Sequence, residues 1–250
     1  MRKKLESLKD HLEDIEQGTE TVSGNASDIQ SGASGIEKDA ASGRNLAKKA
    51  GELSEKAGRL EDAARELRNE AADFSHGAAG ARQDAEENAS RDDAPANAGE
   101  MSQAAGDLAE TSTEIERDVR ELERRISELK RKTDELNDRV KDKAQPGQIQ
   151  SHARDTEETA RDVSDRSRQI RQNTDGAKDQ IGRLEEKIQR VQQKMERLSQ
   201  SGKTGAEGGD AGEKGKPQDG EKGEGRESGE GKPEEGGQKG PSGKQKGSQD

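Results

Sequence analysis

Histidine is the side chain best suited to acid–base and metal chemistry near neutral pH, and this sequence has three. His11, His76 and His152 lie far apart along the chain, and no His-x3-His pair or His/Asp cluster has the spacing of metal ligands. The absence of cysteine excludes disulfides, thiolate nucleophiles and zinc–thiolate sites. Carboxylates are common, but they lack the apolar surroundings that would raise a pKa for proton transfer. We therefore expect no catalytic or metal-binding residue.

A short glycine-containing stretch near residue 200 is the one motif that suggests phosphate binding. Gly202-Lys203-Thr204 matches the end of a P-loop, but the glycine required five residues earlier is Arg197. The preceding segment also has a helical pattern, whereas a P-loop follows a strand. We therefore expect no cofactor and no enzyme activity.

Composition excludes a conventional globular core. Of 250 residues, 40% are charged and only 24% are hydrophobic, about half the usual share. Phe74 is the single aromatic residue, and the net charge is -11. Because basic residues are interspersed with acidic ones and no aromatic residues interleave with them, nucleic-acid binding is not expected.

No targeting or membrane-spanning segment is evident. The basic start, Met1 to Lys4, is followed by charged residues rather than by an apolar segment, so no signal peptide is predicted. No apolar run approaches the roughly 18 to 20 residues that a membrane span requires. We expect a cytoplasmic protein.

Changes in composition divide the chain into four regions. Residues 1–75 are a Gly/Ala-rich heptad region, and residues 76–96, which are small, polar and glycine-containing, are predicted to be a flexible linker. Residues 97–199 carry a stronger heptad pattern. Residues 200–250 are rich in Gly, Lys and Glu and nearly free of apolar residues, so this tail is predicted to be disordered.

The strongest signal is a sustained heptad pattern, in which apolar residues alternate at spacings of three and four. It is interrupted at Pro146-Gly147, where a helix cannot continue without losing a hydrogen bond. The predicted coiled-coil seam comprises Leu108, Ile115, Val119, Leu122, Ile126, Leu129, Leu136, Val140, Val163, Ile170, Ile181, Leu184, Ile188, Val191, Met195 and Leu198.

Charge favours an antiparallel hairpin over a parallel dimer for residues 97–199. A parallel homodimer would bring like charges together, for example Arg166 opposite Arg171. Folding back about Gln148 instead places Glu123 near Arg171 and Glu116 near Lys178. We therefore predict a long antiparallel coiled-coil hairpin that turns at Pro146-Gly147.

A weaker version of the same pattern runs through residues 1–75 and slips at Ser42-Gly43. It predicts a second hairpin turning near Gly43, with one long helix containing a three-residue stammer as the alternative. Because each interior glycine costs about 1 kcal/mol relative to alanine, this glycine-containing region is expected to be the less stable of the two.

Two families resemble parts of the chain. The stretch from Leu46 to Leu60, continuing to Phe74, resembles the last cytoplasmic helix of methyl-accepting chemotaxis proteins over about 30 residues. That resemblance implies long antiparallel hairpins with small seam residues, but the family's hairpin-tip motif is absent, so kinase control is not carried to any residue. The glycine-rich, cysteine-free composition is also similar to late-embryogenesis-abundant and hydrophilin proteins, although those favour an 11-residue repeat.

Together these observations predict an all-α fold of long antiparallel coiled-coil hairpins with a disordered C-terminal tail. We expect a non-enzymatic structural or protein-interaction protein that acts as a rod or docking surface. Its partners would be other proteins or a second copy, through the coiled-coil faces, in a four-helix bundle or a homodimer. The alternatives are a stress protectant of the hydrophilin type and a chemoreceptor-like signalling rod.

Overall fold

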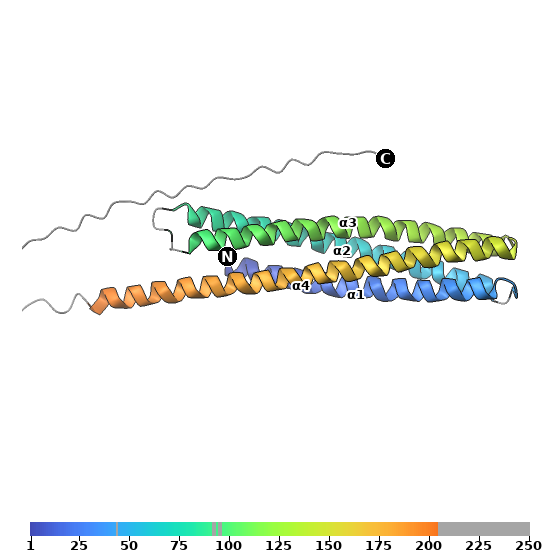
Figure 1. Cartoon of the computed structure of the whole chain (residues 1–250), viewed down its shortest axis with the longest axis horizontal. Coiled ribbons are helices and arrows are strands. Elements are labelled where there is room, and N and C mark those ends of the chain that lie inside the picture. The colour runs from blue at the N-terminus through green and yellow to red at the C-terminus, as the bar shows by residue number, and fades with distance from the viewer. Residues whose placement is uncertain (44, 92–93, 95–96, 205–250) are drawn as a thin grey trace, which may run out of the picture. The chain divides into compact units, whose positions relative to one another are not determined.

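A computed structural model describes most of the chain, and it is helical throughout (Figure 1). The described residues are 1–43, 45–91, 94 and 97–204, with side chains described as far as residue 197. They form four helices: α1 (Arg2–Asp39), α2 (Leu46–Ala89), α3 (Ala98–Lys141) and α4 (Pro146–Thr204). The described part contains no strand, which confirms the all-α prediction. The predicted disordered tail lies outside the described residues from position 205 onward.

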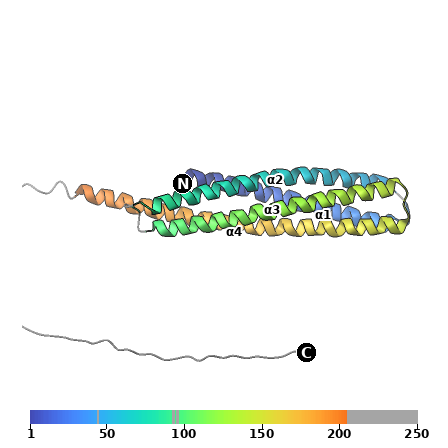
Figure 2. The same cartoon turned by 90° about the horizontal axis from the view of Figure 1, so that it is seen from above.

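The four helices run alternately up and down and form one bundle within a single chain (Figures 1 and 2). Helix α1 packs against α2 and α4, and α3 packs against the same two helices, so helices at opposite corners do not meet. At 1.5 Å per residue, the 44 residues of α2 or α3 span about 66 Å. The two predicted hairpins therefore complete one bundle without a second copy.

Both turns contain residues in the left-handed backbone region. In the first, Gly43 has φ +66° and Asn45 has φ 55°, and glycine adopts this region at no steric cost. In the second, Lys143 has φ 51°, and α4 begins at Pro146, where the missing N–H needs no partner. The first turn reverses the chain near Gly43, so the alternative of one long helix is wrong.

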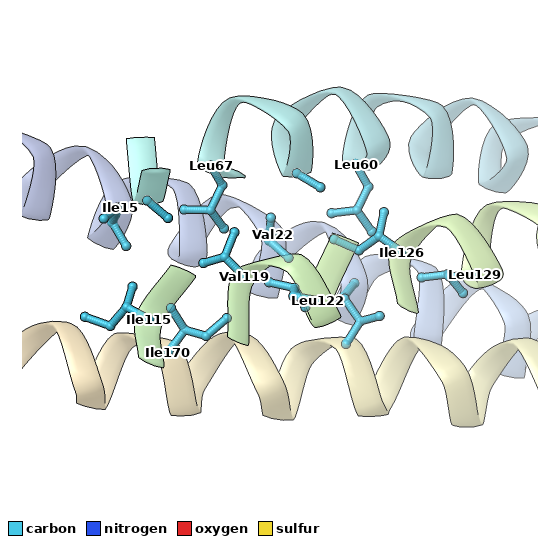
Figure 3. Packing of buried hydrophobic residues seen from close by; sticks show 14 of the residues in the cluster. Ile15, Val22, Leu60, Leu67, Ile115, Val119, Leu122, Ile126, Leu129 and Ile170 are labelled. Atoms are coloured by element: carbon cyan, nitrogen blue, oxygen red, sulfur yellow. The ribbon is translucent and has the colours of Figure 1, made fainter. Parts of the chain in front are cut away.

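The core runs along the bundle axis and is built from the three-and-four pattern of every helix (Figure 3). Leucine, isoleucine and valine fill it from α1, α3 and α4, and Phe74 of α2 is fully buried. Along α2, small residues alternate with large ones, as in Ala57, Leu60, Ala64 and Leu67. This alternation lets neighbouring layers interdigitate.

The predicted flexible linker at residues 76–96 is wrong for most of its length. Helix α2 continues to Ala89, and three alanines within this stretch, Ala78, Ala81 and Ala85, are buried. Gly77 lies where an added Cβ would come within 2.7 Å of the Leu8 side chain, so this glycine allows a close approach of α1 and α2. Composition suggested a linker because the buried residues here are alanines rather than large apolar residues.

The predicted partner register of α3 and α4 is also wrong, by about one heptad. Folding about Gln148 would place Glu123 near Arg171, whereas Arg171 contacts Glu16 of α1 and Glu123 contacts Arg68 of α2. Across α3 and α4 the observed pairs include Arg166–Glu121, with 2.9 Å between Nη2 and Oε1. Helix α3 ends at Lys141, so the chain reverses before Gln148, the predicted turning point. Every residue of α3 therefore faces a residue of α4 about one heptad away from the predicted partner.

Candidate docking surfaces

The predicted coiled-coil seam lies in the bundle core rather than on a surface. All of its residues are buried except two: Met195 is 54% exposed, and Leu198 lies in the part of α4 whose side chains are not described. The seam residues of α3 and α4 face α1 and α2 as well as each other, and Figure 3 shows Val119 and Ile126 beside Leu67 and Leu60. The covered faces are therefore not open for docking along most of their length.

The outer surface is charged, and ion pairs join helices across the bundle. Glu16 of α1 pairs with both Lys178 and Arg171 of α4. The hydrogen bond and charge of Lys178, with a further contribution from Arg171, lower the pKa of Glu16 below its usual value. Arg68 of α2 similarly reaches Glu123 of α3, with 3.2 Å between Nη1 and Oε1. Together with Arg166–Glu121 between α4 and α3, these ion pairs link three of the four pairs of neighbouring helices.

Two partly buried carboxylates illustrate how the ion pairs of this surface lower carboxyl pKa values. Burial raises the pKa of Glu128, but Lys132 and Arg125 outweigh burial, so its pKa is lowered. At Asp134, burial is likewise outweighed by hydrogen bonds from Lys130 and Ser54, and the pKa is lowered. A carboxylic acid that donates protons near neutral pH needs the opposite shift. The ion pairs keep these groups charged, which suits a structural role.

The three histidines, which all lie among the described residues, form no hydrogen bond with one another. His11 contacts Glu70 across α1 and α2, with 2.9 Å between Nδ1 and Oε2. His76 bonds through Nδ1 to the carbonyl of Ala72, one turn earlier in its own helix. In the described part of the chain, no group of three or more histidine or acidic side chains is arranged to hold a metal ion.

A groove of about 890 Å³ follows the outer face of α2 and α3. We call it the side groove. Its acidic residues include Asp107, Glu110 and Glu114 of α3, which form no ion pair with any described residue. Two arginines also line it, Arg82 paired with Glu86 and Arg117 beside Asp118. The remaining lining residues are Ser75, Ala79, Gln83, Ser102, Gln103, Gly106, Ala109 and Thr113.

Helix α4 is longer than the others and continues past the end of the bundle (Figures 1 and 2). Val191 is the last buried residue described on it, and the helix runs on to Thr204. We call residues 192–204 the α4 extension. Met195, on this extension, is the only exposed large hydrophobic residue among those described. It borders a smaller hollow of about 320 Å³ lined by Ala98, Met101, Ile188 and Val191 among others.

The α4 extension follows from the observed register and was not predicted from the sequence. Folding about Gln148 would pair Met101 of α3 with Met195 of α4. The shift of about one heptad instead brings the start of α3 to the level of Lys187 and Ile188, so Met195 lies past the start of α3. The sequence contained no signal for the side groove either, because its acidic residues occupy ordinary outward positions on α3.

No protein-family model, curated protein or solved structure matches this chain. The resemblance to chemotaxis-protein helices is neither supported nor contradicted by these comparisons and stays a hypothesis. Within the described residues, no helix combines the length and apolarity that a membrane span requires.

Proposed function

We propose that this protein is a non-enzymatic structural protein that acts as a rod and presents its charged sides for docking of other proteins. One observation carries the proposal. The apolar residues of all four helices lie in a single internal core that runs along the bundle, and ion pairs join the helices across its surface. Such a bundle holds its two ends at a fixed separation and offers long, straight, charged faces.

A distance measurement between the two ends tests the rod. Because the chain has no cysteine, spin labels can be placed only at the introduced positions Ser42→Cys and Gly99→Cys, at opposite ends of the bundle. We expect one narrow distance distribution at about 60 Å, from the rise of 1.5 Å per residue. Urea should broaden it. A broad distribution in dilute buffer would contradict the rod.

Circular dichroism of the full chain separates the proposal from the hydrophilin alternative. A rod protein is helical in dilute buffer and unfolds cooperatively on heating. A stress protectant of the hydrophilin type is disordered in dilute buffer and gains helix on drying. The second outcome would replace the proposed function.

Site-specific photo-crosslinking tests docking in the cell. A photoreactive amino acid at exposed Arg124 or Arg161, on α3 and α4, should give discrete cross-linked products with other proteins. The same label in a chain unfolded by Leu122→Asp should give none of these products, because a docking face requires the folded bundle. Identical products from folded and unfolded chains would argue against a docking surface.

A further inference from the structure

The α4 extension continues past the end of the bundle and carries an exposed apolar residue and positive charge. It is about 20 Å long at 1.5 Å per residue, and Met195 on it is 54% exposed. Lys194 and Arg197 flank Met195 and form no ion pair with any described residue, and Glu196 is the one acidic residue between them. In a chain of net charge -11, this end is locally basic.

The side groove has the complementary properties. It extends along α3 from Ser102 to Arg117, about 22 Å, which matches the length of the α4 extension. Asp107, Glu110 and Glu114 give it three carboxylates that are unpaired within the described part of the chain. Its small residues, such as Gly106 and Ala109, leave space for a side chain, since a Cβ added at Gly106 would meet nothing within 4 Å.

We propose that the α4 extension of one copy docks in the side groove of a second copy, and that the second copy returns the same contact. The resulting dimer joins the bundles tail to tail, with Met195 over the small residues and Lys194 and Arg197 beside the groove carboxylates. A two-fold axis makes each contact twice, which is the usual geometry of homodimers. The inference rests on the proposed function, since it names one partner of the docking rod.

Other occupants fit the same features less well. The α4 extension points away from its own bundle, so it cannot reach its own side groove as a continuous helix (Figures 1 and 2). Two extensions paired antiparallel over residues 192–204 would bring Arg197, which is next to the centre of the overlap, close to its symmetry-related copy, a like-charge contact. The sequence beyond the α4 extension has only Ala206 and Ala211 as apolar residues, too little to cover Met195 or fill the side groove.

Charge exchange tests the proposal. Sedimentation equilibrium of the full chain should show a concentration-dependent dimer. Lys194→Glu with Arg197→Glu, or Glu110→Lys with Glu114→Lys, should each weaken the dimer by about tenfold or more. Mixing the two variants should restore it, because each extension then faces a groove of opposite charge. The matched control, Arg124→Glu with Lys143→Glu, changes the same number of exposed charges elsewhere and should leave the dimer unchanged.

A second measurement keeps the result independent of charge and folding. The variant Met195→Cys with Gly106→Cys should be joined between chains by a short bifunctional maleimide, and Gln193→Cys with Gly106→Cys should react less. A monomer at every concentration, or a dimer that neither charge variant weakens, would overturn the proposal. Helicity measured on the same samples distinguishes failure of the dimer from failure of the proposed function. A helical monomer would contradict the dimer alone, whereas an unmodified chain without helix would contradict the rod.

Discussion

The two hairpins of the bundle share one core but fill it differently. Buried polar side chains are concentrated in α3 and α4, whereas α1 and α2 contribute only Thr19. Those in the second hairpin are Ser112, Thr133, Asn137, Thr156, Thr159, Ser164, Ser167 and Thr174. Most of their hydroxyls donate to carbonyls of their own helix, as Thr174 does to Ile170 at 2.9 Å.

Glycines show the reverse contrast. In α1 and α2, a Cβ added at Gly18, Gly32 or Gly77 would come within 3.0 Å or less of a leucine on the other helix. In α3 and α4, a Cβ added at any described glycine would meet nothing within 4 Å. The first hairpin therefore has glycines where α1 and α2 approach closely, and apart from Thr19 its buried side chains are apolar. In the second hairpin no described glycine lies at a close helix contact, and several hydroxyl side chains are buried in the core.

The largest expected effect comes from placing a charge in the shared core. Leu122 is fully buried, and an unpaired buried carboxylate is far too costly for the fold to retain. Leu122→Asp should abolish helicity in all four helices, not only in α3 and α4, when followed by circular dichroism. Retention of about half the helical signal would mean that the α1–α2 hairpin folds by itself, which would break the view of one core.

Removing buried hydroxyls should stabilise the second hairpin. Thr156 and Thr174 are fully buried, and each hydroxyl donates to a carbonyl one turn earlier in its own helix. Valine keeps the side-chain branching and removes a polar group from the core. Thr156→Val with Thr174→Val should raise the free energy of unfolding by about 1 to 2 kcal/mol in urea titrations. A loss of stability would show that the hydroxyls favour the fold.

Alanine substitutions at glycine should change the free energy of unfolding differently in the two hairpins. Gly176→Ala and Gly182→Ala in α4 should each stabilise by up to about 1 kcal/mol, because alanine favours helix and nothing obstructs its Cβ. Gly32→Ala should lack this gain, since its Cβ would lie 2.5 Å from Cδ2 of Leu53. Gly24→Ala, in the same helix as Gly32 and with open space, is the matched control. Equal gains at Gly32 and Gly24 would remove the contrast.

The smallest expected effect concerns pH and the contact between α1 and α4. The pKa of Glu16 is lowered by Lys178 and Arg171, so its ionised form favours the folded state. That contribution is present above the unfolded-state pKa near 4.5 and is lost as pH falls through the lowered folded-state value. Glu16→Gln should reduce stability at pH 7 and match the unsubstituted chain more closely near pH 3, in urea titrations at both values. Glu13→Gln, without a described ion pair, should show no such convergence.

The helices and their buried faces were predictable from the heptad pattern, because spacings of three and four determine which side of a helix is apolar. The register of α3 against α4 was not predictable, because sliding one helix along the other by a whole heptad again places apolar residues opposite apolar residues. The observed register differs from the predicted one by about one heptad. The short turn after Lys141 selects between the two, and its length is a matter of local backbone geometry at Lys143.

The joining of two hairpins into one bundle was left open by the sequence. The width of the apolar stripe on a helix determines whether the helix packs against one neighbouring helix or against two. In alanine-rich stretches this width is hard to judge from the sequence, because alanine occurs both in helix cores and on helix surfaces. The residues from Ala78 to Ala85 illustrate this, since they continue the spacing of Ala71 and Phe74 without a large side chain. The lower stability expected of the N-terminal region stays a prediction; in the structure, Gly32 and Gly77 lie at contacts between α1 and α2, and both hairpins share one core.

The adjacency of α1 and α4 has a mechanical consequence. The start of α1 and the C-terminal end of α4 lie at the same end of the bundle (Figure 1). The two helices run antiparallel, as the Lys9–Glu185 and Glu37–Arg154 pairs together show. A tension applied to these two points pulls the helices apart one layer at a time, like a zipper, and does not shear many layers at once. The bundle would therefore yield at low force when stretched from these points, yet resist a load applied between its opposite ends, where α2 or α3 must be sheared as a whole.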